Sequence, residues 1–153
     1  MDKVGVLIVA YGAREVAIAD ALLKSERYDV ELYVADKQRN PFNAKVAKRH
    51  VAVPDLNVKK ILNFAKENVN EIDFGIVGPE NPIIEGVRDE VEGKLGIPML
   101  CPTESYALEK SKAEQRLLLE EVSPEVNPKF KIFDPRDYPA GKKNKVLRTL
   151  RNG

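Results

Sequence analysis

Short apolar segments alternate with segments of helical spacing over the first hundred residues of the chain. The segment Lys3–Ala10 is apolar at nearly every position, which is typical of a parallel strand buried on both faces. The same pattern predicts four further strands, at Asp29–Asp36, His50–Val53, Asp73–Gly78 and Ile97–Cys101. The polar stretch Lys37–Arg49 is predicted as a loop with one short helical turn.

Three helices are predicted between these strands. The first begins at about Arg14, the second is capped by Asp55, and the third ends at Gly96 before a proline. Their expected apolar faces are Val16, Ala17, Ala21 and Leu22 in the first, Val58, Ile61, Leu62 and Ala65 in the second, and Ile84, Val87, Val91 and Leu95 in the third.

Strands that alternate with helices at these short intervals imply right-handed crossovers and a parallel sheet. The predicted fold class is therefore α/β, with an open, doubly wound parallel sheet of about five strands in residues 1–102. Residues 103–153 are predicted to hold a long helix capped by Thr103, a strand at Lys129–Asp134 and a basic helix at Lys142–Arg151. These elements are too few for a core of their own, so we expect a linker helix and the incomplete beginning of a second domain.

Composition narrows the class of protein further. The 153 residues are 43% hydrophobic, and 25 basic residues balance 24 acidic ones, so a disordered chain and a general polyanion binder are both disfavoured. The single cysteine cannot form an intramolecular disulfide, and no apolar run approaches the roughly 18 residues of a membrane span. We expect a cytoplasmic protein that binds neither membranes nor nucleic acid.

The turn after the first strand is the first candidate binding site. Open parallel sheets bind ligands at the carboxyl ends of their strands, where the strand order reverses. The turn Ala10–Glu15 leads into a helix N-terminus, whose amides and dipole favour an anion such as phosphate. Arg14 is placed to add a bidentate phosphate contact.

The same turn is a poor match to the dinucleotide fingerprint G-x-G-x-x-G. Only Gly12 is present, and Ala10 and Glu15 take the other two glycine places. Glu15 would crowd the contact between helix and strand and would place a negative charge near a pyrophosphate. Asp36, however, ends the second strand, where dinucleotide enzymes bind a ribose hydroxyl. A stand-alone Rossmann-type nucleotide or NAD(P)-binding module therefore remains an alternative, as does a non-catalytic interaction remnant.

Metal and nucleophile chemistry find little support in the sequence. His50 is the only histidine and Cys101 the only cysteine, so no second histidine or cysteine exists to build a zinc site or a Cys–His pair. We predict structural roles for both and assign no catalytic or metal-binding residue.

Three motifs in order give a more specific indication. They are "AYGAREVAIA" at Ala10–Ala19, "VGPENPIIEGV" at Val77–Val87 and "CPTESYALEKSK" at Cys101–Lys112. Together they resemble the N-terminal part of the phosphoribosylamine–glycine ligase family. The chain departs from the family pattern at Ala10, Ala13, Val16 and Cys101, and in the loop "ADKQRNPFN" after the second strand.

The resemblance implies an ATP-grasp ligase of purine biosynthesis that joins glycine to 5-phosphoribosylamine through an acyl phosphate, with ATP and Mg or Mn. It implies a Rossmann-like domain followed by a partial start of the ATP-grasp domain, whose ATP- and metal-binding residues would lie beyond Gly153. The chain alone is then expected to be inactive, with the ATP-grasp domain as a contacting partner. The residues that the resemblance assigns are Gly12, Ala13 and Arg14 around the sugar phosphate, Glu80 at the ribose hydroxyls or the amine, Gly78 and Pro79 in its turn, and Lys112 toward the nucleotide phosphates.

Overall fold

The computed structural model describes residues 1–108 and 111–133. They belong to two compact units, residues 1–110 and residues 111–153. The first unit holds the sheet and the helices that cover it, and the second holds helix α6 (Lys112–Val122).

The first unit is built on a five-stranded parallel sheet with the strand order β3-β2-β1-β4-β5. The strands are β1 (Asp2–Ala10), β2 (Tyr28–Asp36), β3 (Arg49–Ala52), β4 (Phe74–Val77) and β5 (Met99–Leu100). All five start and end within about two residues of their predicted positions. The order runs outward from β1 in both directions, so the predicted open, doubly wound α/β fold is confirmed.

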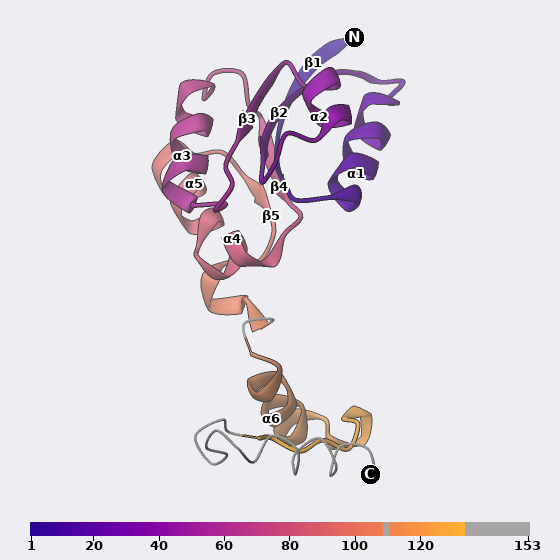
Figure 1. The fold of residues 1–153 in the computed structure, drawn as a ribbon, viewed down its shortest axis with the longest axis vertical. Helices are drawn as coiled ribbons and strands as arrows, with labels where there is room; N and C mark the ends of the chain where they lie inside the picture. Colours follow the sequence, from indigo (N-terminus) through magenta and orange to yellow (C-terminus); the bar gives the residue numbers. More distant parts are fainter. Residues whose placement is uncertain (109–110, 134–153) are drawn as a thin grey trace, which may run out of the picture. The chain divides into compact units, whose positions relative to one another are not determined.

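Helices cover both faces of the sheet, as Figure 1 shows. Helices α1 (Ala13–Leu23) and α2 (Pro41–Val46) pack over one face, and α3 (Val58–Glu67) and α5 (Val87–Leu95) over the other. Side chains of β1 alternate between the two cores, which explains why its sequence is apolar at successive positions. One core contains Val6, Ile8, Ala10, Ala19, Leu32 and Val34, and the other contains Leu7, Val9, Tyr33, Ile61, Ala65, Val87 and Val91 among others.

Strand register brings the ends of β1 and β4 together. Val9 pairs with Val77, and the amide of Gly78 donates to the Val9 carbonyl at 3.1 Å. The turns that follow these two strands therefore start side by side at the point where the strand order reverses.

The predicted apolar stripe of α1 is confirmed only in part, at Leu22, which packs against the core. Ala17 and Ala21 are exposed, whereas Glu15 and Ala19 are buried and Ile18 packs beside them. The apolar pattern placed the helix in the wrong rotation because it excluded a glutamate from the buried face. Glu15 is tolerated there because its carboxylate is hydrogen-bonded within the chain.

The predicted face of α3 is confirmed, but its predicted cap is wrong. Asn57, and not Asp55, is the N-cap, and its side chain accepts from the amides of Lys59 and Lys60. Asp55 instead accepts from the amide of Asn57 at 3.3 Å and pairs with the Lys60 ammonium at 2.9 Å.

The third predicted helix is two helices, α4 (Glu80–Ile84) and α5. Gly86 separates them with a φ of 76°, a left-handed conformation that glycine adopts readily because it has no Cβ. The predicted end at Gly96 is confirmed, with that glycine as a left-handed C-cap.

The prediction of one long helix over Glu104–Val122 is wrong. A 3₁₀ turn, η1, covers Glu104–Tyr106, and α6 begins only at Lys112. The Thr103 hydroxyl lies 3.0 Å from that of Ser105 and makes no cap, whereas Ser111 is extended and its hydroxyl accepts the Glu114 amide at 3.2 Å. The helix therefore starts after Ser111 and not after Thr103.

The second unit is described over residues 111–133 and contains α6 and the 3₁₀ turn η3 (Pro124–Val126). The strand predicted from Lys129 is absent over the described residues 129–133, and Asp134 lies outside them. The predicted basic helix Lys142–Arg151 also lies outside the described residues. Among the helices that are described, none combines the length and apolar character required to cross a bilayer.

Candidate functional site

A pocket of about 390 Å³ opens in the first unit where β1 and β4 end. Three residues of the predicted site line it, namely Arg14 from the start of α1, Gly78 from the turn after β4, and Glu80 from the start of α4. The volume lies within the usual range for small-molecule pockets, roughly 300–1,000 Å³. The position is the switch point at which open parallel sheets bind ligands.

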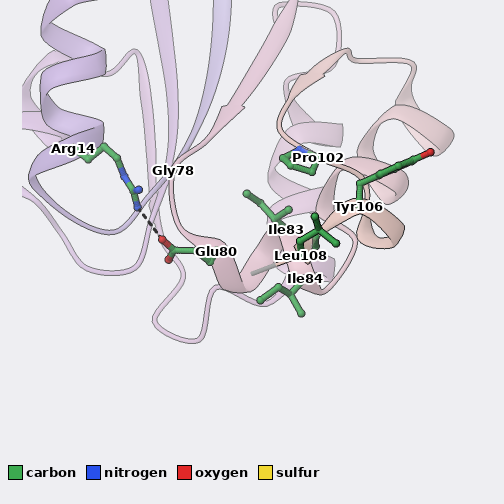
Figure 2. Close-up of a pocket in the computed structure, with 9 residues that line it drawn as sticks. Arg14, Gly78, Glu80, Ile83, Ile84, Pro102, Tyr106 and Leu108 are labelled. Atoms are coloured by element: carbon green, nitrogen blue, oxygen red, sulfur yellow. Dashed lines mark ion pairs between the residues drawn. The ribbon is translucent and has the colours of Figure 1, made fainter. Parts of the chain in front are cut away.

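Arg14 and Glu80 form an ion pair on one side of the pocket. Figure 2 shows the Arg14 side chain reaching from α1 toward the Glu80 carboxylate, and the Nη2 to Oε1 distance is 3.6 Å. The two side chains remain 59% and 51% exposed, so both charged groups are accessible to a ligand. The pocket therefore offers a cation and an anion to one small molecule.

Glu15 is a buried carboxylate behind this pair, with only 1% of its surface exposed. Its Oε2 accepts from the Gly12 amide at 2.8 Å and from the Tyr11 amide at 3.2 Å, and its Oε1 accepts from Arg14 Nε at 3.1 Å. Burial alone would raise the pKa of Glu15, but the amides of Gly12 and Tyr11 outweigh it and hold that pKa below its ordinary value. The carboxylate is ionised at neutral pH.

This arrangement corrects one expectation about the first turn. The Gly12 amide is not free to bind a phosphate, because it donates to the carboxylate of Glu15. Glu15 does crowd the strand exit, as its place in the fingerprint predicted. A Cβ added to Gly78 would lie 1.7 Å from Glu15 Oε1, so glycine is required there for space.

The other three residues of the predicted substrate site lie near the pocket without lining it. Gly12 is the N-cap of α1, and a Cβ added to it would meet no atom within 4 Å. Ala13 is the exposed first residue of α1, and its amide lies in the first turn, where helices offer no internal acceptor. Pro79 is the buried N-cap of α4.

The opposite wall of the pocket is apolar and was not predicted from the sequence. Figure 2 shows Ile83, Ile84 and Leu108 close together on the far side of Glu80 from Arg14. Hydrogen bonds fasten the segment that carries part of this wall, because Arg88 donates to the Cys101 carbonyl at 2.7 Å and Asp89 accepts the Glu104 amide at 2.9 Å. The sequence signal that could have indicated this wall is the set of apolar residues that follow the ends of β4 and β5. The full wall consists of Ile83, Ile84, Pro102, Tyr106, Ala107 and Leu108.

Lys112 belongs to the second unit. It is the first residue of α6, directly after the Ser111 cap, and its ammonium lies 3.4 Å from Gln115 Oε1.

The dinucleotide alternative requires an accessible Asp36 carboxylate at the end of β2, and the structure buries it. It is 1% exposed, and its Oδ2 accepts from Asn43 Nδ2 at 3.0 Å and lies 3.6 Å from His50 Nε2. His50 packs within this cluster, in keeping with a structural role. Burial raises the pKa of Cys101 to about 11, so its thiol is protonated at neutral pH and is a poor nucleophile.

The sheet order and the pocket at its switch point define a Rossmann-like α/β domain. Comparison with known families identifies the domain more closely. The family model "Phosphoribosylglycinamide synthetase, N domain" matches residues 4–109, more than half of the chain, and the chain belongs to this family. The resemblance drawn from the three sequence motifs is thereby confirmed.

Similar proteins of known name agree with this assignment. The chain is 38% identical over 132 residues to the phosphoribosylamine–glycine ligase of Pyrococcus furiosus and 39% identical over 133 residues to that of Methanobrevibacter smithii. Each match covers 86% of this chain and 29% of the relative. The chain thus spans less than a third of the length of these ligases.

Proposed function

We propose that the pocket binds 5-phosphoribosylamine and that the chain contributes this binding step to a purine-biosynthesis ligase. The observation that carries the proposal is the Arg14–Glu80 pair, at 3.6 Å, on the rim of the switch-point pocket. Phosphoribosylamine bears a dianionic phosphate on one side of a ribose and an amine and hydroxyls on the other. A guanidinium and a carboxylate on one pocket rim match such a molecule in charge.

Each side chain has a distinct part in this proposal. Arg14 directs its terminal nitrogens into the pocket and donates to the phosphate. Glu80 accepts from the ribose hydroxyls or steadies the amine, and Gly78 lines the pocket while leaving room for the Glu15 carboxylate behind it. Gly12, Ala13 and Pro79 shape the two turns that hold these groups.

The proposed reaction follows that of the phosphoribosylamine–glycine ligases. ATP phosphorylates the carboxylate of glycine, which converts a poor leaving group into phosphate. The amine of phosphoribosylamine then attacks the acyl carbon, the C–N bond forms, the C–O bond to phosphate breaks, and the amine loses a proton. Residues of this chain orient the amine for that attack.

ATP and its metal are proposed to be bound mainly by the part of the ligases that the chain does not match. Within the described ranges 1–108 and 111–133, no three His, Cys, Asp or Glu side chains gather as metal ligands would. We further propose that Lys112 contacts the nucleotide phosphates, because it is the last residue of the motif Cys101–Lys112.

Calorimetric titration with ribose 5-phosphate, a stable analogue, tests the proposed site. Arg14→Ala and Glu80→Gln are expected to weaken binding about tenfold each, because each removes a charge-assisted hydrogen bond. The matched controls are Arg27→Ala and Glu85→Gln, which change exposed residues outside the pocket and are expected to bind as the wild type. Equal weakening by the controls would refute the site.

Two further assays separate the proposal from its alternatives. Incubation of the 153-residue chain with ATP, glycine and phosphoribosylamine is expected to give no turnover, and robust turnover would show that the chain is a complete enzyme. Titration with NAD(H) and NADP(H) is expected to show no tight binding, because the Asp36 carboxylate is buried against Asn43.

A further inference from the structure

Glu15 is the least expected charged side chain of the first unit. It is almost fully buried on the face of α1 that packs against the sheet, where Ala19 is its buried neighbour one turn on. An isolated carboxylate at such a position costs several kcal/mol unless it is hydrogen-bonded. Its partners therefore indicate what it does.

Two of these partners belong to the backbone of the β1–α1 turn. Glu15 is the third residue of α1, and its carboxylate accepts the amide of the N-cap Gly12 at 2.8 Å. This contact is half of a capping box, which a solvent-exposed glutamate makes equally well. Capping alone does not account for the burial of the side chain or for its position against Gly78.

The third partner is the guanidinium that lines the pocket. Glu15 Oε1 binds Arg14 at Nε, the inner nitrogen, at 3.1 Å, which leaves the terminal nitrogens directed at the pocket. The Nη2 atom then lies 3.6 Å from Glu80. Figure 2 shows the extended path of Arg14 toward that carboxylate.

Gly78 completes the arrangement from the side of β4. Glu15 Oε1 occupies the space in which a Cβ of residue 78 would lie, so the same oxygen contacts both the arginine and the pocket floor. The position of Arg14 is thereby tied to the end of β4, close to the Glu80 that begins α4.

We infer that Glu15 is a positioning residue, a buried carboxylate that holds Arg14 by its Nε atom so that the terminal nitrogens point into the pocket. The inference rests on the proposed function for its effect on ligand binding. Arginine side chains have many rotamers, and fixing them before the ligand arrives removes an entropic cost from binding. The hydrogen bonds from the Gly12 and Tyr11 amides keep the carboxylate an ionised acceptor at neutral pH.

The first test uses the wild-type chain without ligand. Exchange of the Arg14 Nε proton with water is followed by NMR and compared with that of exposed Arg27. We expect exchange about tenfold slower at Arg14, since its Nε donates to a buried carboxylate. Exchange as fast as at Arg27 would overturn the proposal.

The second test measures ribose 5-phosphate affinity in Glu15→Gln, Arg14→Ala and the double variant. Glu15→Gln keeps the size of the side chain and is expected to weaken binding about tenfold. In the Arg14→Ala background the same change is expected to have less than about a twofold effect, because no guanidinium remains to be positioned. An equal loss in both backgrounds would mean a merely structural role and would refute the inference.

The two tests also separate this inference from the proposed function. If the wild-type chain does not bind ribose 5-phosphate, the proposed function fails, while the exchange rate at Arg14 still decides whether Glu15 fixes the guanidinium. If Glu15→Gln does not fold, the exchange measurement on the wild type decides the question by itself. Glu85→Gln at the C-terminal end of α4 is the matched control and is expected to leave both readouts unchanged.

Discussion

The tight approach of Glu15 to Gly78 leads to a quantitative prediction for Gly78→Ala. A Cβ at residue 78 would lie 1.7 Å from Oε1, 2.3 Å from Cδ and 2.5 Å from Cγ of Glu15, far inside contact distance. The carboxylate must move away, and its hydrogen bonds with the Gly12 and Tyr11 amides must lengthen or break. Overpacking costs about 1–3 kcal/mol, and a lost charged hydrogen bond about 1.5–3 kcal/mol. We expect the free energy of unfolding to fall by about 3–5 kcal/mol.

Urea unfolding of the 153-residue chain measures this loss, with Gly12→Ala as the matched control. A Cβ at residue 12 meets no atom within 4 Å, and the backbone there is extended, so that variant is expected to stay within about 0.5 kcal/mol of the wild type. In a Glu15→Ala background the cost of Gly78→Ala is expected to drop below about 1 kcal/mol, because the clash is gone. An undiminished cost in that background, or a stable Gly78→Ala chain, would refute the reasoning.

Three further predictions concern the scaffold. Asn57→Ala is expected to lower the free energy of unfolding by about 1 kcal/mol, because the Asn57 side chain caps α3. Asp55→Ala is expected to lower it by less. If urea unfolding ranks the two variants in the opposite order, Asp55 and not Asn57 is the cap. Gly96→Ala is expected to lower the free energy of unfolding by about 1 kcal/mol, because the φ of Gly96 is 69°. Gly93→Ala in α5 is expected to raise it by about 0.5–1 kcal/mol, because alanine favours the helix and its Cβ would meet no atom within 4 Å. Equal effects of the two variants in thermal unfolding would contradict this contrast. Hydrogen bonds from Lys3 and Lys48 lower the pKa of Glu31 from 4.5 to about 2, so the stability it contributes is present above pH 4.5 and is lost as the pH falls toward 2. Glu31→Gln should flatten the pH dependence of unfolding in that window, and an unchanged slope would exclude the assigned cause.

The sheet could be predicted because its central strands β1 and β2 are buried at successive positions, on both faces, over their C-terminal halves. The nearly continuous apolar run Lys3–Ala10 predicts a buried parallel strand, and the helical spacing from Val58 to Ala65 predicts a helix with one buried face. The structure has both elements at these positions. The helix expected over Glu104–Val122 failed for the opposite reason. Its residues are mostly exposed, so burial does not determine where the helix starts. The start depends on whether Thr103 or Ser111 is the N-cap, and the sequence alone does not distinguish these two hydroxyl residues.

The candidate site was predictable in part. Arg14, Gly78 and Glu80 could be assigned to one site through the family motifs, and the register of β1 with β4 brings the turns that carry them side by side. The role of Glu15 could not be found from its residue type, because a buried glutamate depends on three donors that only the folded turn supplies. The apolar wall depends on the path of residues 102–108 after β5, which is fixed by contacts with α5 that are distant in sequence.

The most direct test of the central claim is a map of amide chemical shifts during titration of the wild-type chain with ribose 5-phosphate. Binding at the switch point predicts that the shifts concentrate at Arg14, Gly78 and Glu80, with smaller changes at Gly12. Saturating shifts at the opposite end of the sheet, around Lys3 and Glu71, would contradict the account, as would an unchanged spectrum.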